Sequence, residues 1–305
     1  MKYIVNFDFD CNFPRKFVDL NYKNRAFFEW IFFFLNNDEN NILYSKEKYS
    51  ESYFKKISNF GAVLTKITTD DKDVVPWWGN FEDFEIKKKY ISKIDILSTL
   101  KDLELIPSFV RPIKDQKDLD EVLSVDGQYF FREEYSFSGI GSCTYQSNTT
   151  YPFKRGVIAP LLDVVLTFGV TVNLETNEYF ICSNRIGRNG AFVGGRVVVD
   201  NEIASLLEMS ELEFKESLLS IFNDLRNNNA KGTIQFDSLI YNNSGVRKWY
   251  QIVEVNYRKT MGLLIKKLFD LFGDGEFVIS HKPLSEGILI SPDNLKLKSY
   301  YIPIA

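Results

Sequence analysis

The sequence predicts an α/β (α+β) fold with an N-terminal parallel-sheet αβα domain, a small β-rich subdomain and a C-terminal α+β subdomain. Strands and helices alternate over roughly the first 90 residues, which is typical of a parallel sheet. From residue 129 onward, strand-like runs separated by turns dominate. The longest helical pattern, residues 206–227, precedes a predicted hairpin at residues 232–258. A chain of 305 residues is long enough for such a two- or three-part protein.

The N-terminal domain is predicted over residues 1–90. Its strands are expected at residues 3–9, 42–44 and 62–67, and its helices at residues 25–36 and 50–60. Gly61 stands at the stop position, because glycine readily adopts the left-handed backbone of a helix end. Trp77 and Trp78 are expected to pack in a seam between domains, with stacking on a substrate as the alternative.

Two further subdomains are predicted, over residues 91–162 and 163–305. Helices are expected at residues 91–103, opened by Ser92, at 118–123, at 206–227 with a cap-like Ser210, and at 260–272, ended by Gly273. Strands are expected at residues 129–133, 156–159, 164–174 and 178–186, the last two paired. The sequence shows no internal repeat and no low-complexity stretch.

Bulk composition excludes several classes of function. Apolar residues make up 45% and charged residues 26% of the chain, which is ordinary for a globular protein. The formal net charge of −4 argues against a surface that coats nucleic acid. Three widely spaced cysteines (Cys11, Cys143 and Cys182) and one histidine, His281, argue against structural zinc and a Cys–His catalytic pair. We expect reduced cysteines and a structural or exposed histidine.

A membrane protein is not expected. The N-terminus carries an acid as early as Asp8 and lacks the long apolar core of a secretory leader. The apolar run at residues 27–35 is too short to span a bilayer and is interrupted by Glu29. Because its flanks carry no basic polar face, a buried helix is favoured over an interfacial one. The sequence therefore predicts a cytoplasmic protein.

The predicted hairpin gathers oxygen ligands. Period-2 alternation places Glu254, Asn256 and Arg258 on one face of its second strand. The first strand carries Asp237, and the turn at residues 242–245 would bring it opposite Glu254. Two carboxylates this close repel unless a cation lies between them, so we expect Asp237, Glu254 and Asn256 to bind Mg²⁺. The alternative is a polar, solvent-facing side of a surface hairpin.

At these residues the chain resembles the ATP-grasp ligases, which include biotin carboxylase and D-alanine–D-alanine ligase. The resemblance rests on Gly-Thr-Ile-Gln-Phe-Asp ending at Asp237, and on Glu-Val-Asn-Tyr-Arg from Glu254 to Arg258. It covers about residues 90–270 and implies an ATP-grasp fold whose β-rich subdomain is a lid. It also implies that Asp237, Glu254 and Asn256 ligate Mg²⁺ bridging the phosphates of ATP, and that Arg258 holds the transferred phosphate.

The resemblance extends to residues that would hold the nucleotide phosphates. The loop at residues 136–142 matches in position the flexible phosphate-covering loop of the family, and its residues Ser138, Gly139, Gly141 and Ser142 would wrap phosphate oxygens. Alone, such a loop is equally typical of a plain turn. Lys93 and Arg132 would meet the α- and β-phosphates. Arg132 departs from the usual Lys, keeping the charge and adding a forked donor.

An adenine-binding hinge is implied at residues 158–163. Pro160 can offer only a carbonyl and Leu162 can offer an N–H, which suits the edge of adenine. Asp163 or Thr167 would contact the ribose. Ala159 stands where the family often has Glu, so the adenine amino group loses one partner.

A glycine-rich basic loop at residues 184–196 completes the implied site. Arginine recognises carboxylates and phosphates through paired donors. We expect Arg196 to face the γ-phosphate or the carboxylate, as a second catalytic arginine beside Arg258, and Arg188 to contact the substrate. The alternative is a hairpin tip with solvated arginines.

The function implied by the resemblance is an ADP-forming carboxylate–amine ligase. ATP would activate a small carboxylate as an acyl phosphate, which an amine such as an amino acid or a peptide-like compound would then attack. A homodimer is also expected, because dimers are common among similar ligases. Alternatives are a ligase with a thiol or bicarbonate acceptor, and a nucleotide-binding scaffold or maturation protein with little turnover. The departures at Ala159 and Arg132 motivate the scaffold.

Overall fold

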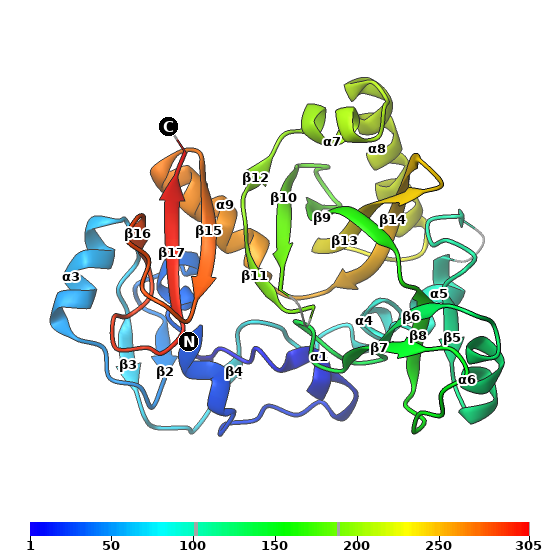
Figure 1. The fold of residues 1–305 in the computed structure, drawn as a ribbon. Coiled ribbons are helices and arrows are strands. Elements are labelled where there is room, and N and C mark those ends of the chain that lie inside the picture. The colour runs from blue at the N-terminus through cyan, green and yellow to red at the C-terminus, as the bar shows by residue number, and fades with distance from the viewer. Residues whose placement is uncertain (101–102, 188–189, 305) are drawn as a thin grey trace. The chain divides into compact units, whose positions relative to one another are not determined.

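The computed structural model describes residues 1–100, 103–187 and 190–304 (Figure 1). It divides into two compact units, each discontinuous along the chain. The first unit comprises residues 1–81, 193–197 and 258–305, and the second comprises residues 82–192 and 198–257. The subdomain boundaries predicted at residues 90 and 162 stay a prediction.

A four-stranded parallel sheet organises the first unit, which confirms the parallel sheet expected from the sequence. Its order is β3-β2-β1-β4. The strands are β1 (Lys2–Ile4), β2 (Ile42–Tyr44), β3 (Lys66–Thr68) and β4 (Val75–Pro76). The helices between them are α1 (Phe9–Asn12), two 3-10 turns (Phe13–Arg15 and Lys23–Phe27), α2 (Ile31–Leu35) and α3 (Glu51–Asn59).

Three N-terminal elements are shorter than predicted, and one of them is the strand expected at residues 62–67, which is β3 over Lys66–Thr68 only. The strand expected at residues 3–9 ends at Ile4, because the side chain of Asn6 bonds the backbone of Trp78 and Gly79 instead of continuing the ladder. The helix expected at residues 25–36 splits into a 3-10 turn and α2. There the buried guanidinium of Arg25 donates to the backbone oxygens of Val5 and Leu20, which holds the chain away from one continuous helix.

Aromatic side chains fill the core of the first unit. Trp30 and Phe32 to Phe34 are fully or almost fully buried, so the apolar run is a core segment as expected. Trp77 packs on Phe32 with ring centroids 4.8 Å apart, and Trp78 packs on Phe7 at 4.3 Å. Both tryptophans are buried within this unit, so neither is an exposed stacking platform.

The later segments of the chain supply the remaining strands of the first unit. These elements are β11 (Phe192–Gly195), β12 (Val197–Val198) at the unit boundary, α9 (Met261–Phe272), β15 (Gly275–Ser280), β16 (Ile288–Leu289) and β17 (Lys298–Pro303). Antiparallel pairing joins the end of β11 to β15, β15 to β17 and β17 to β16. Helix α9 has Thr260 as its N-cap and Gly273 as its C-cap, so it agrees with the predicted helix to within one residue.

The second unit contains two antiparallel sheets. Its elements are α4 (Phe84–Ile91), α5 (Asp95–Leu100), β5 (Arg111–Ile113), α6 (Gln116–Leu123), β6 (Gln128–Glu133), β7 (Ser142–Gln146), β8 (Gly156–Pro160), β9 (Asp163–Asn173), β10 (Tyr179–Ile186), α7 (Asp200–Leu206), α8 (Glu211–Asn227), β13 (Thr233–Asn243) and β14 (Val246–Asn256). The smaller sheet has the order β5-β8-β6-β7, and in the larger one β9 lies between β10 and β13, which pairs with β14. Each strand predicted between residues 129 and 186 is present.

Helix α8 covers the larger sheet. Phe214 packs on Trp249 of β14, and Phe222 packs on Phe236 of β13, with centroids 5.2 and 6.3 Å apart. The helix expected at residues 206–227 is interrupted before Ser210, whose hydroxyl accepts from the backbone of Glu213 in a capping box. Its first residue belongs to α7 instead.

The helix expected at residues 91–103 is also divided. Helix α4 ends at Ile91, and Ser92 caps α5 by accepting a hydrogen bond from the backbone N–H of Asp95. Lys93 therefore lies in the break between two helices rather than at the start of one. Among the described residues, no helix is both long and apolar enough to cross a membrane.

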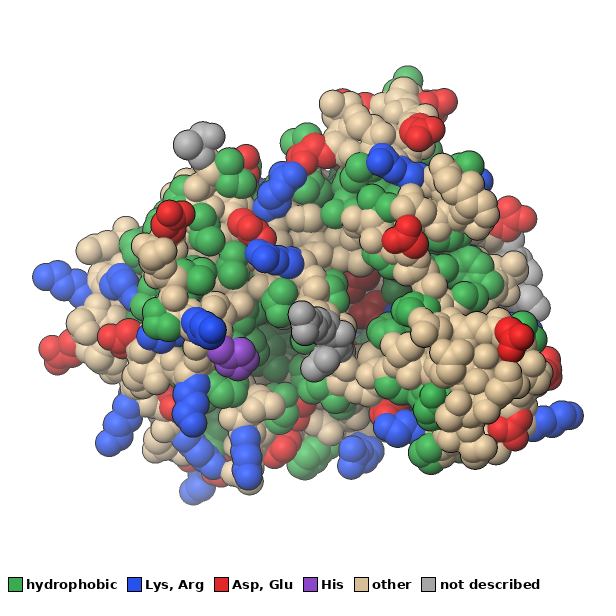
Figure 2. Space-filling view, in the orientation of Figure 1, with side chains coloured by type: hydrophobic (Ala, Val, Ile, Leu, Met, Phe, Trp, Pro, Cys, Tyr) green, Lys and Arg blue, Asp and Glu red, His purple; other side chains and the backbone are tan. Residues whose placement is uncertain are grey.

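The charged surface is mixed rather than segregated. Figure 2 shows Lys and Arg side chains interspersed with Asp and Glu on the visible face. His281 is exposed, in agreement with its expected structural or surface role.

Candidate active site

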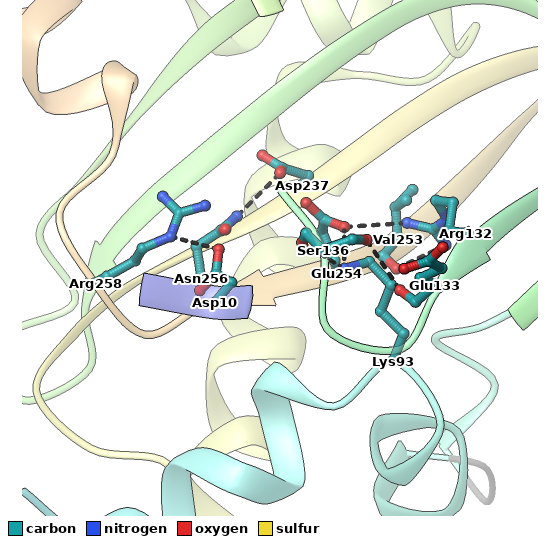
Figure 3. Close-up of polar contacts among 10 residues, drawn as sticks. All are labelled: Asp10, Lys93, Arg132, Glu133, Ser136, Asp237, Val253, Glu254, Asn256 and Arg258. Carbon is teal, nitrogen blue, oxygen red and sulfur yellow. Dashed lines mark hydrogen bonds and ion pairs between the residues drawn. The ribbon is translucent and has the colours of Figure 1, made fainter. Parts of the chain in front are cut away.

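The β13–β14 hairpin of the second unit brings the predicted oxygen ligands together (Figure 3). Asp237 pairs directly with Glu254 in the antiparallel register, and Gln235 pairs with Asn256. Side chains of directly opposite residues lie on the same face of a sheet, with Cβ atoms about 5 Å apart. The expected juxtaposition of Asp237 and Glu254 is therefore confirmed.

The strict alternation predicted along β14 is wrong in two places. An irregularity lies between Asp237 and Leu239, where the hydroxyl of Ser238 donates to the backbone oxygen of Gln251 and the N–H of Ile252 donates to Leu105. The strand also ends at Asn256, so Arg258 does not share a strand face with Glu254. A bulge of this kind adds residues to one strand and re-aims the side chains beside it.

Amide groups fix the carboxylate of Asp237. Gln235 Nε2 donates to Asp237 Oδ1 at 2.8 Å, and Asn256 Nδ2 donates to Asp237 Oδ2 at 3.0 Å. The hydroxyl of Thr171 on β9 donates to Gln235 Oε1 at 3.2 Å, which sets the orientation of that amide. With its Nδ2 turned to Asp237, Asn256 is left with its carbonyl oxygen as a potential ligand.

Gly169 makes room for this arrangement. It pairs with Asp237 across β9 and β13. A Cβ at this position would lie 2.6 Å from Gln235 Nε2 and 3.0 Å from Asp237 Oδ1. Glycine is therefore required here by the close approach of side chains from the neighbouring strand.

Two cations converge on one oxygen of Glu254. Lys93 Nζ lies 3.4 Å from Glu254 Oε2, and Arg132 Nη1 lies 3.2 Å from the same atom. The side chains of Lys93 and Arg132 are 7% and 14% exposed. Arg132 Nη2 also donates to the backbone oxygen of Val253 at 3.3 Å. These contacts link β6 and the segment between α4 and α5 to β14, the strand that carries Glu254.

The hydroxyl of Tyr250 lies close to Arg132 of this charge cluster. Burial raises the pKa of its hydroxyl, while the neighbouring Arg132 guanidinium acts in the opposite direction. Tyr250 belongs to an apolar cluster that also contains Ile94 and Val157, with Ala159 and Leu162 packed against it. The predicted phosphate cations therefore lie next to the apolar residues of the predicted hinge.

The loop between β6 and β7, where a phosphate loop is predicted, has a backbone that depends on glycine. Ser138, Gly139 and Gly141 all have positive φ, at 49°, 78° and 76°. Lys93 Nζ donates to the backbone oxygen of Ser136 at 2.9 Å, which anchors the start of the loop. Ser142 is the first residue of β7, and its N–H donates to Gly139. Left-handed conformations of this kind orient successive N–H groups to one side.

The hinge residues lie at the junction of β8 and β9. Pro160 ends β8 and Asp163 begins β9, so Leu162 is in the two-residue connection. The N–H of the neighbouring Leu161 donates to Gln128. The carboxylate of Asp163 accepts from Asn242 Nδ2 at 2.7 Å, whereas the hydroxyl of Thr167 donates to Asn184.

The predicted arginines belong to other parts of the structure. Arg258 is in the first unit, where its Nε donates to Asp10 Oδ2 at 2.7 Å. Arg196 is also in the first unit, and its Nη1 donates to the backbone oxygen of Val197 at 3.3 Å. Arg188 lies outside the described residues.

Three polar residues that bond the predicted site residues, directly or through one another, were missed in the sequence. Gln235 precedes Asp237 by two residues, so the same period-2 argument that identified Glu254 and Asn256 would have placed it on the ligand face. Thr171 and Asp10 carry no comparable signal, because their partners are 64 and 248 residues away in the chain.

The oxygen donors of the hairpin fit a hard divalent cation. Asp237 and Glu254 supply carboxylates and Asn256 supplies an amide oxygen, which are the ligand types that Mg²⁺ prefers, with water and phosphate completing its shell. The described residues contain no group of three His, Cys, Asp or Glu side chains placed to hold a metal ion. These donors therefore suit a site in which phosphate oxygens supply some of the cation's ligands, and not a site in which the protein supplies all of them.

No family model and no curated protein matches this sequence. Solved structures with the same fold do exist. N5-carboxyaminoimidazole synthetase from Staphylococcus aureus, complexed with ADP, aligns with 99% of this chain and 92% of its own at a TM-score of 0.54 and 10% identity. Biotin carboxylase from Campylobacter jejuni, in a β,γ-ATP complex, aligns with 95% of this chain and 77% of its own, with a TM-score of 0.53 and 7% identity.

A third similar structure is the biotin carboxylase domain dimer of the 2-oxoglutarate carboxylase from Hydrogenobacter thermophilus, in complex with MgADP, ADP and bicarbonate. It aligns with 100% of this chain and 86% of its own, at a TM-score of 0.53 and 8% identity. These proteins are ATP-grasp enzymes, so the expected fold is confirmed: this chain has the ATP-grasp fold.

Proposed function

We propose that this chain is an ADP-forming ATP-grasp ligase that activates a small carboxylate and joins it to an amine. The observation that carries the proposal is the direct pairing of Asp237 with Glu254, whose carboxylate also meets Lys93 and Arg132. Two acids and two cations at one place suit a metal–triphosphate complex, because the acids can bind the metal ion and the cations can bind the phosphates. Similar structures described with ADP or MgADP support a nucleotide at this fold.

Lys93 and Arg132 would bind the α- and β-phosphates. Both side chains are largely buried and already anchored, Lys93 on Ser136 and Arg132 on Val253, so little rotamer entropy is lost when a phosphate replaces Glu254 as their partner. The loop residues Ser138, Gly139, Gly141 and Ser142 would cover the phosphates. Pro160, Leu162 and Asp163 would meet the adenosine, beside the apolar cluster that contains Tyr250.

Asp237, Glu254 and Asn256 would hold Mg²⁺. When bound, the ion neutralises the charge on the phosphate oxygens and orients the γ-phosphate. The hydrogen bonds donated by the amides of Gln235 and Asn256 hold the Asp237 carboxylate in a fixed orientation.

The reaction is two displacements. An oxygen of the substrate carboxylate attacks the γ-phosphorus, the bond from that phosphorus to the bridging oxygen breaks, and ADP leaves. The amine nitrogen then attacks the acyl carbon, inorganic phosphate departs with the C–O electron pair, and the nitrogen loses a proton. Catalysis here requires positioning and charge stabilisation rather than a protein nucleophile.

Arg258 would stabilise the transferred phosphate, with Arg196 and Arg188 contacting the carboxylate. The chain connectivity supports the role of Arg258. Two residues span at most about 7 Å, so the Cα of Arg258 cannot be farther than that from the Cα of the proposed ligand Asn256.

A homodimer and a cytoplasmic setting belong to the same proposal. Cys11, Cys143 and Cys182 form no disulfide with one another.

The test is ADP release with ATP, Mg²⁺ and pooled amino acids and small carboxylates. We expect substrate-dependent ADP release that Asp237→Asn abolishes. Asp126→Asn is the matched control, because Asp126 also accepts an amide hydrogen bond, from Asn148, but is exposed and far along the chain from the hairpin. Nucleotide binding without ADP release under any substrate would contradict the ligase and favour a scaffold.

A further inference from the structure

Arg258 is held by a carboxylate from the opposite end of the sequence. Its Nε donates to Oδ2 of Asp10, which lies in α1 directly after the first strand of the parallel sheet. The two side chains are 11% and 8% exposed, so the pair is shielded from water and salt. Both residues belong to the first unit, and Figure 3 shows the Nε edge of the guanidinium facing Asp10.

The backbone around Arg258 is fixed as well. The N–H of Lys259 donates to Trp78 at 2.7 Å, and Lys259 Nζ donates to the backbone oxygen of Trp77 at 3.1 Å while lying 4.7 Å from the centre of the Trp77 ring. Burial lowers the pKa of the Lys259 ammonium. Because Trp77 and Trp78 are themselves buried, the segment after Asn256 has a firm support.

The geometry leaves one edge of the guanidinium available. Nε is taken by Asp10, and Nη1 donates to the backbone oxygen of Lys259 at 3.1 Å. Among residues 1–100, 103–187 and 190–304, no hydrogen bond or ion pair involves Nη2. An arginine has five N–H donors in a rigid planar fork, so fixing one edge also fixes the direction of the other.

We infer that Asp10 is a positioning residue that aims the guanidinium of Arg258 at the phosphate group transferred in the reaction. The inference rests on the proposed function and adds to it a residue of the N-terminal segment. A buried ion pair usually stabilises a fold little compared with apolar residues of the same volume. The Asp10 carboxylate can, however, orient the other N–H donors of Arg258, which an apolar residue could not do.

The first test is a double-mutant cycle on the rate of ADP release. Asp10→Asn keeps the shape and one acceptor oxygen but loses the charge that locks Nε. We expect kcat to fall on the order of 10- to 100-fold, with the KM for MgATP unchanged. In an Arg258→Met background, Asp10→Asn should cost no further rate, because a residue that acts through Arg258 has nothing left to position.

Asp8→Asn is the control. Asp8 is a buried acid of the same segment, bonded to Asn12, and the substitution is the same. It should leave kcat unchanged. Equal losses from Asp10→Asn in the wild-type and Arg258→Met backgrounds would overturn the inference, as would full activity of Asp10→Asn. Asp10→Glu, which keeps the charge but displaces it by one methylene, serves if Asp10→Asn does not fold, and it should lose rate only where Arg258 is present.

A second readout does not depend on turnover. The Nε–H signal of Arg258 in a ¹⁵N-labelled protein, assigned by its loss in Arg258→Met, should be sharp and slow to exchange in the wild type and broadened in Asp10→Asn. Titration with inorganic phosphate should shift this signal, with weaker affinity in Asp10→Asn than in Asp8→Asn. Unchanged exchange and phosphate affinity in Asp10→Asn would refute the positioning role. A wild type that shows these shifts but releases no ADP would instead refute the proposed ligase activity alone.

Discussion

Lys93 and Glu254 form an ion pair, with 3.4 Å between Nζ and Oε2, at the place where a nucleotide phosphate is expected. Arg132 shares the same oxygen. Glu254 is therefore an internal counter-ion for both cations that we propose bind phosphate, although it is also a proposed metal ligand. Binding of MgATP would exchange these partners, so that the cations meet phosphate and Glu254 meets the metal. In this proposal, the ion pair would disfavour the binding of nucleotide that arrives without metal.

Glu254→Gln should separate these two roles. Without the carboxylate, Lys93 and Arg132 lose their counter-ion and attract phosphate more strongly. We expect the affinity for metal-free ADP, measured by calorimetry in EDTA, to rise roughly fivefold, which corresponds to about 1 kcal/mol for a partly exposed ion pair. The gain in ADP affinity on adding Mg²⁺ should be lost.

Glu121→Gln provides the comparison for this measurement. Glu121 pairs with Arg111 at 3.0 Å in the same unit, but both side chains are more than half exposed. Its removal should leave ADP affinity unchanged with and without Mg²⁺. A Glu254→Gln protein that binds metal-free ADP no better than the wild type would show that Glu254 does not compete with phosphate.

Thr171→Val should weaken the metal site without touching a ligand. The substitution removes the hydroxyl that orients Gln235 and keeps the branched shape that suits a strand. Gln235 can then rotate and release Asp237 Oδ1. Changes in groups that orient metal ligands typically cost 10- to 100-fold in metal affinity. We expect a loss on the order of 10-fold in the affinity for Mn²⁺ in the presence of ADP, measured by electron paramagnetic resonance.

Thr167→Val is the control on the same strand, measured at saturating ADP because Thr167 is also a candidate ribose contact. The hydroxyl of Thr167 donates to the backbone oxygen of Asn184 and does not reach the amides around Asp237. Both variants lose one hydrogen bond, so a comparable drop in thermal stability is expected. An equal loss of Mn²⁺ affinity in the two proteins would mean that the Thr171–Gln235 bond has no special role.

Gly169→Ala tests the close packing of Gly169 against the side chains of Gln235 and Asp237. Its Cβ would meet Gln235 at 2.6 Å, so the side chain of Gln235 must move. Overpacking of this kind costs about 1–3 kcal/mol of stability, and Mn²⁺ affinity should fall with it. In Gly169→Ala/Gln235→Ala the contacts with Gln235 are removed and only the 3.0 Å contact with Asp237 Oδ1 remains, so most of the thermal stability should recover while Mn²⁺ affinity should not. Recovery of both would show that Gln235 is dispensable for the metal.

The carboxylate hairpin could be predicted from sequence because its signals are local. A two-residue turn, Ser244 and Gly245, separates β13 from β14 and fixes their antiparallel pairing. That register alone would place Asp237 opposite Ile252, and the irregularity between Asp237 and Leu239 brings Glu254 there instead. The period-2 pattern then places polar side chains on one face. The same reasoning failed at Arg258, because the chain leaves the strand after Asn256 and its next partners are Asp10 and Trp78.

Elements that depend on distant contacts were not predictable from local periodicity. The break between α4 and α5 is fixed by Glu134, whose side chain accepts from Ser92 and whose backbone oxygen accepts from Lys93. The pattern of apolar residues around Lys93 still fits one continuous helix. The assignment of Lys93 to a phosphate rests on its place before the predicted phosphate loop and stays a prediction, since the order of elements does not depend on their exact boundaries.

The pH dependence of stability should reveal the buried acid of the first unit. Glu29 is 1% exposed, and burial raises the pKa of its carboxyl above the ordinary value of 4.5, although bonds from Ser45 and Tyr49 oppose the shift. A raised pKa means that the folded protein binds this proton more tightly than the unfolded chain. Stability from this group is therefore present below pH 4.5 and is lost as pH rises through the folded pKa.

Glu29→Gln should remove the loss of stability that Glu29 causes as pH rises. The hydroxyls of Ser45 and Tyr49 both donate to Glu29 Oε1, and the amide oxygen of Gln can accept the same two bonds. The variant no longer buries a charge. We expect the variant to be more stable than the wild type above the raised pKa, by about 1 kcal/mol or roughly 2 °C in Tm, and to approach it near pH 4.5. Glu39→Gln, at an exposed position of the same unit, should shift Tm at neither pH. If Glu29→Gln is less stable than the wild type at pH 8, attraction to the neighbouring Arg25 outweighs the burial of the Glu29 charge.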